Sequence, residues 1–252
     1  MLLKVYTDKV TLNYQEFLNP TYPAMLQDLL SLLFPEICHA CDQPLARGER
    51  YICTECNVKL PYTDLHLHGA TELNYLQQRF WGKVPIRFAF SYMHFRSKGR
   101  VQRVLHHLKY KGAQDLGEHL GKRYGAILSE HGYAAHLDLV VPVPLHQLKL
   151  RRRGYNQSEG FAKGLAEALQ IPWSNKVLER ISDTESQTKK SRLDRWQNVE
   201  QVFKVKQVGE VKGKRILLVD DVLTTGATLE ACAHALLQQG CSDVSVTTIA
   251  AA

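Results

Sequence analysis

The stretch ILLVDDVLTTGATL, residues 216–229, joins an aliphatic run to two adjacent carboxylates and to small hydroxylated residues around one glycine. A continuous apolar run is typical of a central parallel strand that is covered on both faces. Asp220 and Asp221 then fall at the C-terminal end of that strand, where open α/β sheets bind ligands. The residues that follow have an apolar stripe at helical spacing, and Gly240 stands where that helix would end. The stretch therefore predicts a strand, a turn and a helix.

The turn between this strand and helix has the composition of a phosphate site. Residues 224–228 offer hydroxyl donors, a glycine that tolerates a left-handed turn, and backbone N–H groups at the start of a helix. Two carboxylates beside the turn would repel a bare polyphosphate, but they accept hydrogen bonds from sugar hydroxyls and help to hold Mg²⁺. A phosphorylated pentose fits, whereas a Walker loop does not, because Gly112-x4-Gly117 is followed by Glu118 instead of lysine. A generic turn with two solvated aspartates is the alternative interpretation.

The hydrophobic periodicity of the rest of the chain alternates between the strand and helix types. Apolar and polar residues alternate over 85–95, which predicts a strand with one buried face and a domain boundary before it. Residues 57–84 carry no motif. Buried strands are predicted at 137–145 and 243–250, and helices at 24–34, 99–112, 115–129 and 158–169. Strands that alternate with helices predict an α/β fold with a parallel sheet.

Four of the six cysteines form two CxxC pairs, Cys38 with Cys41 and Cys53 with Cys56. Each pair offers two thiolates from one tight turn, and two pairs complete a tetrahedral zinc site that has no open position for chemistry. We therefore predict a small ribbon with a structural Zn²⁺, which supplies most of the ribbon's folding free energy. Two disulfides or a redox-active CxxC are the alternatives, but disulfides are rare in a reducing cytosol. Cys232 is expected to be a small core residue.

Composition and charge restrict the location and the partners. No run reaches the roughly 18 apolar residues of a membrane-spanning helix, and the N-terminus lacks the apolar core of a signal peptide. We therefore expect a cytoplasmic protein without membrane insertion. The net charge of +7 favours ligands that carry phosphate, or nucleic acid, without choosing between them.

The opening stretch resembles the signature of type I phosphoribosyltransferases that binds 5-phosphoribosyl 1-pyrophosphate (PRPP). The resemblance implies the parallel-sheet fold of that family, with Asp220 and Asp221 on the ribose hydroxyls, directly or through Mg²⁺. It also implies a set of ligands for the 5-phosphate, namely Thr224, Thr225, Gly226, Ala227 and Thr228.

Two further segments correspond to parts of the same family. VPVPLHQLKLRRRGYNQ, residues 141–157, takes the place of the pyrophosphate loop. The PRPP-binding residues implied there are Val143, Pro144, Arg151, Arg152 and Arg153. Residues 184–203 match the flexible loop that closes over PRPP, with Gln187, Arg195 and Asn198 as its implied residues. The alternative interpretations without a function are a solvated basic face for the first segment and an ordinary surface loop for the second.

The order of the motifs is similar to that of the competence protein ComF family. A leucine-rich helix, a four-cysteine ribbon, LKYKG (108–112), the pyrophosphate-loop segment, the flexible-loop segment and the PRPP signature follow one another from about Met25 to the C-terminus. The resemblance implies Met25 as a start and residues 1–24 as an extension. It implies a helix plus zinc ribbon over 25–68 and a phosphoribosyltransferase-like domain over 80–252.

The ComF resemblance implies a role in DNA uptake during natural transformation, with PRPP and Mg²⁺ as ligands and no defined acceptor. Three hypotheses follow. The first is a phosphoribosyltransferase with an unknown acceptor, in which the two aspartates stabilise a cationic transition state and the arginines stabilise departing pyrophosphate. The second is a non-enzymatic, PRPP-responsive factor that binds single-stranded DNA or a DNA-uptake helicase. The third is a nucleobase salvage phosphoribosyltransferase.

Overall fold

The computed structural model describes residues 35–68, 73–110, 112–181 and 202–252. Two compact units make up the chain, Met1–Val58 and Lys59–Ala252. The predicted extension and the predicted helix at 24–34 lie outside the described residues, so the domain boundaries proposed from the sequence stay predictions. Among the described helices, none is both long and apolar enough to cross a bilayer.

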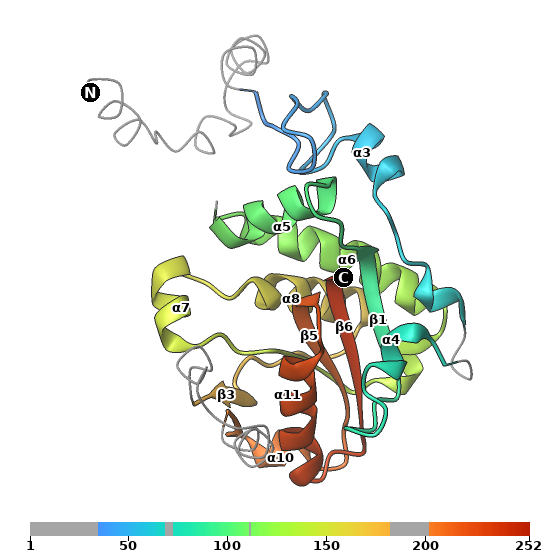
Figure 1. Ribbon diagram of the computed structural model, residues 1–252, viewed down its shortest axis with the longest axis vertical. Coiled ribbons are helices and arrows are strands. Elements are labelled where there is room, and N and C mark those ends of the chain that lie inside the picture. Colours follow the sequence, from blue (N-terminus) through green and yellow to red (C-terminus); the bar gives the residue numbers. More distant parts are fainter. Residues whose placement is uncertain (1–34, 69–72, 111, 182–201) are drawn as a thin grey trace. The chain divides into compact units, whose positions relative to one another are not determined.

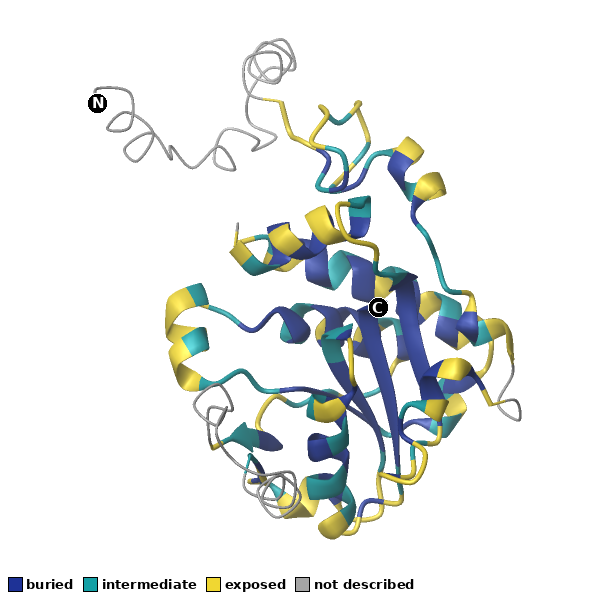
Figure 2. Cartoon of the chain, viewed as in Figure 1, coloured by how far each residue is buried: buried dark blue, intermediate teal, exposed yellow. Residues whose placement is uncertain are grey.

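A four-stranded parallel sheet forms the centre of the larger unit, which confirms the predicted fold class (Figure 1). Its strand order is β1-β6-β5-β2, so the strand of the opening stretch, β5, lies inside the sheet between β6 and β2. The strands are β1 Ala89–His94, β2 Leu139–Pro142, β5 Arg215–Leu223 and β6 Asp243–Ala251. Figure 2 shows β5 and β6 buried along most of their length, as expected for central parallel strands.

Helices cover both faces of this sheet. Figure 1 shows α11, Ala227–Gln238, on one face, where Leu229, Cys232 and Leu236 join the main core cluster; the expectation for Cys232 is thus confirmed. The other face carries α8, Gln157–Leu169, which packs closely on α6, Gln114–Glu130. The other helices of the described residues are α3 Thr54–Lys59, η1 Leu65–His68, α4 Tyr75–Gln78, α5 Arg100–Tyr110, η2 Tyr133–His136, α7 Gln147–Arg153 and α10 Val208–Val211.

The packing of α6 against α8 depends on glycines that repeat at intervals of four. A Cβ added to Gly121 would lie 2.2 Å from the carbonyl oxygen of Phe161, and one added to Gly164 would lie 2.1 Å from that of Glu118. Both distances are far below a van der Waals contact, so only glycine permits this approach of the two backbones. The packing fixes α8 under the sheet, and with it the residues at the N-terminus of α8.

Three predictions about local structure need correction. Strand β1 is buried on both faces from Ala89 to Met93, not on one. Although β1 is an edge strand, Tyr124 and Tyr133 pack on its aromatic residues, while Ala89 on its other face joins the core cluster with Phe80. The basic segment assigned to a pyrophosphate loop contains a short helix, α7.

The third correction concerns the end of the segment assigned to a flexible loop. Most of it lies outside the described residues. Its last residue, Phe203, begins β4 (Phe203–Val205), which pairs with β3 (Leu178–Arg180) as an antiparallel ribbon. The apolar periodicity of strands this short is too brief to predict them from the sequence.

Candidate functional site

The predicted strand, turn and helix are present, and they place the acid pair beside a left-handed turn. Asp220 and Asp221 are half-buried near the C-terminal end of β5. Gly226 caps α11 with a φ of 84°, a conformation that favours glycine. A Cβ at Gly226 would also lie 3.1 Å from Cε1 of Phe80, so this site admits little but glycine. The turn thus gathers the backbone N–H groups of the first turn of α11 at one helix end, an arrangement that suits an anion.

The other residues of the predicted phosphate cradle line this turn. Thr224, Thr225 and Ala227 are exposed, and Thr228 is half-buried. The backbone N–H of Ala227 donates to Oγ1 of Thr225 at 3.4 Å. Hydroxyl and N–H donors therefore gather at one helix N-terminus, as the sequence predicted, next to the acid pair.

Asp220 is held in place by hydrogen bonds to one of its carboxylate oxygens. The hydroxyl of Ser158 donates to Oδ1 at 3.2 Å, and the backbone N–H of Asp221 donates to the same atom at 2.8 Å. Burial and the neighbouring charge of Asp221 raise the pKa of Asp220 to about 7, and these two hydrogen bonds and Lys109 offset part of that rise.

Asp221 has a cationic partner. Nζ of Lys109, at the end of α5, lies 2.8 Å from Oδ2 of Asp221, and both side chains are largely covered. Lys109 was not among the site residues predicted from the sequence, although it lies in the LKYKG motif. Lys109 ends a helix that is remote in sequence from the aspartates, so the sequence alone does not predict this contact.

The segment that follows β2 reaches the same end of the sheet. The backbone N–H of Val143 donates to the carbonyl oxygen of Val219 at 2.8 Å, which brings Val143 and Pro144 alongside the strand that carries the aspartates. Asn156 secures this segment: its Nδ2 donates to the carbonyl of Val143 at 2.9 Å, and its Oδ1 accepts the N–H of Ser158 as the N-cap of α8.

The predicted arginines lie in the last turn of α7, a helix with no buried residue. Arg151 and Arg152 are exposed, and the guanidinium of Arg153 lies 5.5 Å from the ring centre of Tyr110. The structure gives Asp221 a lysine partner from α5 and places these arginines on a neighbouring helix. The implied flexible-loop residues Gln187, Arg195 and Asn198 lie outside the described residues.

Sequence reasoning also missed Ser158 and Arg79. The guanidinium of Arg79 donates to the carbonyl oxygens of Thr224 and Ala252, so it ties the start of the turn that precedes α11 to the residue that follows β6. Arg79 belongs to a stretch without a motif, and a serine in the first turn of a helix is ordinary. Neither residue type, taken alone, distinguishes a site.

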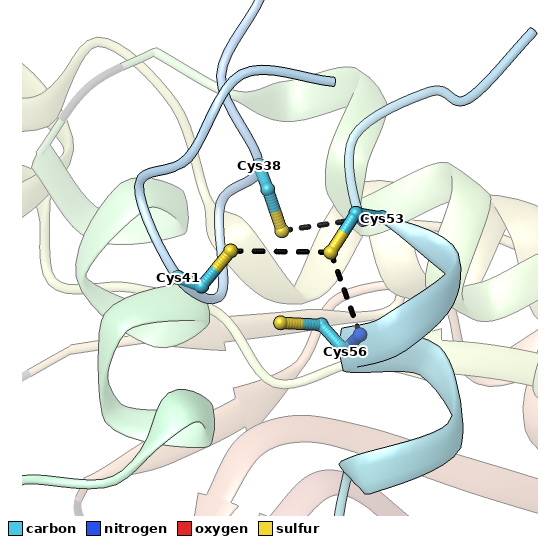
Figure 3. Close-up of side chains that lie close together, drawn as sticks. All are labelled: Cys38, Cys41, Cys53 and Cys56. Carbon is cyan, nitrogen blue, oxygen red and sulfur yellow. Dashed lines mark hydrogen bonds between the residues drawn. The ribbon is translucent and has the colours of Figure 1, made fainter. Parts of the chain in front are cut away.

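The four-cysteine cluster lies in the smaller unit (Figure 3). The Sγ atoms of Cys38, Cys41, Cys53 and Cys56 all lie within 4.8 Å of one another, and those of Cys41 and Cys53 are 3.9 Å apart. Four thiolates at about 2.3 Å from a zinc ion stand about 3.8 Å apart, whereas a disulfide requires about 2.05 Å. None of the six cysteines, all of which lie in the described residues, forms a disulfide. The cluster therefore has the geometry of a closed zinc site and not that of two disulfides.

Backbone N–H groups support the thiolates in this cluster. Cys53 donates to Sγ of Cys38 at 3.3 Å, and Ala40 donates to the same sulfur at 3.4 Å. Burial raises the pKa of Cys38, but these two donors, together with hydrogen bonds from Cys41, outweigh it and bring the pKa to about 7. Donors of this kind are suited to sulfur atoms that bind a metal as thiolates.

Comparisons with known proteins identify the domain that carries the acid pair and the turn. A family described as "Phosphoribosyl transferase domain" matches residues 155–252, which include the acid pair and the turn. Competence protein F of Haemophilus influenzae is 28% identical over 209 residues, 79% of this chain and 84% of that protein. DNA utilization protein YhgH of Escherichia coli K12 is 27% identical over 233 residues, 85% of this chain and 96% of that protein.

A third relative, competence protein ComFC of Bacillus subtilis, is 32% identical over 140 residues, 56% of this chain and 55% of that protein. The matches to competence protein F and YhgH extend over most of the chain and beyond the phosphoribosyltransferase domain. With its four-cysteine cluster ahead of that domain, the chain is similar over most of its length to competence proteins of the ComF family, and it carries a phosphoribosyltransferase domain.

Proposed function

We propose that this protein binds PRPP with Mg²⁺ at the C-terminal edge of the sheet and acts as a phosphoribosyltransferase in DNA uptake. The observation that carries the proposal is the acid pair next to the left-handed turn that opens α11. The N–H groups and hydroxyls of that turn suit the 5-phosphate, because an anion at a helix N-terminus is stabilised by both donors and dipole. Asp220 and Asp221 suit the ribose hydroxyls, which donate to carboxylates.

The chemistry proposed for the site is a displacement at the anomeric carbon of PRPP. The bond from that carbon to the pyrophosphate oxygen breaks as a bond to a nitrogen of the acceptor forms, and positive charge develops on the sugar. Asp221, and Asp220 when ionised, stabilise that charge through space. The arginines of α7 are the proposed partners of the leaving pyrophosphate. When bound, Mg²⁺ would neutralise part of the pyrophosphate charge, and carboxylates are ligands that it prefers.

We further propose a structural Zn²⁺ on Cys38, Cys41, Cys53 and Cys56. The sulfur spacing and the N–H donors to Cys38 support it. A four-thiolate site requires reduced cysteines, which supports a cytoplasmic location as part of the same proposal.

The proposed role in DNA uptake rests on the relatives, two of which are named competence proteins and one a DNA utilization protein. A second candidate is a PRPP-responsive factor that acts without catalysis by contacting single-stranded DNA or a helicase. The observation in its favour is α7, which buries none of its residues and exposes Leu148 at 58% together with Arg151 and Arg152. A helix of this kind is available to a polyanionic partner.

The first test is calorimetric titration of zinc-loaded protein with PRPP in the presence of Mg²⁺. The variant Asp220→Asn/Asp221→Asn keeps the shape of both side chains and removes their charge, so we expect binding to weaken at least about 100-fold, or about 2.8 kcal/mol. Asp115→Asn, at an exposed position in the first turn of α6, is the matched control and should bind like the unmodified protein. Equal binding by all three proteins, or none by the unmodified protein, would overturn the proposal.

A second measurement separates the two candidates. A phosphoribosyltransferase releases pyrophosphate when PRPP, Mg²⁺ and a panel of nucleobases and amines are supplied, and the double variant does not. A factor that contacts DNA binds single-stranded DNA with an affinity that falls steeply between about 50 and 200 mM salt. A flat salt dependence together with pyrophosphate release would reject the second candidate.

A further inference from the structure

Lys109 and Asp221 form an ion pair at the centre of the proposed PRPP site. The distance from Nζ to Oδ2 is 2.8 Å, and the side chains are 26% and 18% exposed. The partners come from the last turn of α5 and the end of β5, more than a hundred residues apart in sequence. Lys109 thus contacts the acid pair directly and has no role yet in the proposed reaction.

The end of α5 is held so that Lys109 faces the aspartate. The buried face of α5, with Val101, Val104 and Leu108, anchors the helix. Beyond it, the hydroxyl of Tyr155 donates to the carbonyl oxygen of Leu108, the residue just before Lys109. The side chain of Lys109 is long and flexible, so it can change its partner without a movement of the helix.

The segment that fixes this helix end is the basic one. Tyr155 directly follows the α7 arginines and Gly154, and Arg153 itself lies over the ring of Tyr110, the residue just after Lys109. Lys109 therefore contacts the acid pair, while the residues on either side of it in the sequence contact the basic segment.

Asp221 cannot serve Lys109 and a metal ion equally well. An ammonium group and a divalent cation on one carboxylate would stand within a few ångströms of each other, where their repulsion is strong because the site is partly shielded from water. Binding of Mg²⁺ or of the sugar therefore competes with Lys109. On the proposed function, the pyrophosphate binds at the basic segment, which contacts Tyr110 next to Lys109 through Arg153, so this polyanion would offer the displaced ammonium a new partner.

We propose that Lys109 is an ion-pair switch of this site: it neutralises Asp221 in the ligand-free protein and moves to the pyrophosphate when Mg²⁺ and PRPP bind. The inference rests on the proposed function. It adds a positioning residue to the site and a reason why the site would favour PRPP with its metal over the metal alone. It predicts that Lys109 opposes the binding of a divalent cation alone but favours the binding of PRPP.

The test measures two affinities of the variant Lys109→Met, one for a divalent cation alone and one for PRPP with Mg²⁺. Methionine keeps the length and apolar stem of the side chain. We expect Mn²⁺ alone, followed by the electron paramagnetic resonance signal of the free ion, to bind at least about fivefold more tightly than to the unmodified protein. PRPP with saturating Mg²⁺, measured by calorimetry, should bind at least about tenfold more weakly. These opposite signs distinguish a switch from a structural residue, whose loss would weaken both.

Two further variants complete the design. Lys163→Met removes an exposed lysine whose Nζ lies 2.8 Å from Oε2 of Glu118, so it controls for loss of a similar ion pair and should change neither affinity. Lys109→Gln is measured in parallel, so a folding defect in one variant does not remove the test. If the unmodified protein binds PRPP and the Lys109 variants shift both affinities in one direction or neither, the switch is refuted while the proposed function stands. If the unmodified protein does not bind PRPP, the proposed function itself fails.

Discussion

Gly164→Ala is expected to destabilise the larger unit, although alanine is the better helix former. The added Cβ would lie 2.1 Å from the carbonyl oxygen of Glu118 and 2.7 Å from the backbone nitrogen of Lys122. Carbon and oxygen atoms approach to about 3.3 Å at the closest, so α6 and α8 would have to separate by about 1 Å. The neighbours are backbone atoms, which cannot rotate away as a side chain can.

The magnitude follows from two opposing contributions. Overpacking of this kind costs about 1–3 kcal/mol, and a shift of rigid backbone places Gly164→Ala at the upper end. The gain in helix propensity offsets about 1 kcal/mol, which leaves a net loss of about 2 kcal/mol in the free energy of unfolding. Gly117→Ala is the matched comparison on the same helix pair, because its Cβ would come no closer than 3.4 Å to any neighbour. It should stabilise by about 0.5–1 kcal/mol.

Urea unfolding followed by circular dichroism measures both variants. The two midpoints should move in opposite directions with unchanged slopes. Since α8 carries the hydroxyl of Ser158 to Asp220, Gly164→Ala should also weaken PRPP binding under conditions where the variant is fully folded. Two variants of equal stability, or a more stable Gly164→Ala, would refute the view that glycine sets the distance between these helices.

The other predictions concern the turn, an ion pair and the cysteine cluster. Gly226→Ala should lower the free energy of unfolding by at least about 1–2 kcal/mol and also abolish PRPP binding. Gly132→Ala is the control, because Gly132 has a similar φ of 77° and a Cβ there would have no neighbour within 4 Å. It should affect stability only. The Arg215 guanidinium holds the pKa of Asp138 at about 2, below its ordinary 3.8. The pair should therefore contribute about 1–2 kcal/mol to the free energy of unfolding above pH 4, and this contribution should be lost as the pH falls towards 2. Thermal unfolding of the unmodified protein and of Asp138→Asn over this pH range measures the difference. Cys38→Ser should lose one equivalent of zinc by metal analysis and expose residues 35–58 to protease, and retention of the metal would contradict the four-thiolate site.

The sequence predicted the central part of the fold because its strongest signals are local. The apolar run of β5, the turn glycine Gly226 and the stripe of α11 lie within about two dozen consecutive residues, and each has one dominant physical interpretation. The two CxxC pairs are also local, since each turn is short. The burial of β1 on both faces was not predictable in this way, because it depends on tyrosines from α6 and η2 and on the segment around Phe80.

The contacts that complete the site also depend on residues far apart in the sequence. Ser158 and Lys109 reach the aspartates from helices that their own sequence patterns predict correctly, but no pattern states which end of which helix will face β5. The glycine spacing of α6 and α8 was visible, with Gly117, Gly121 and Gly125 on one helix and a partner pair on the other. Recognising it as close packing requires the knowledge that these two helices are neighbours, which is a property of the topology.

The acid pair shows why the ion pair with Lys109 has consequences beyond stability. Two adjacent carboxylates at the half-buried end of a strand repel each other, and the protein relieves that repulsion in two ways: burial and Asp221 raise the pKa of Asp220, and Lys109 neutralises Asp221. Both effects, the raised pKa of Asp220 and the ion pair of Asp221, lower the negative charge available to bind a metal ion. A ligand that binds here must therefore bring enough negative charge of its own to draw Lys109 away. On the proposed function, PRPP with its metal would do so and a free divalent cation would not, so the same ion pair that neutralises Asp221 in the ligand-free site would also favour the complete ligand over its parts.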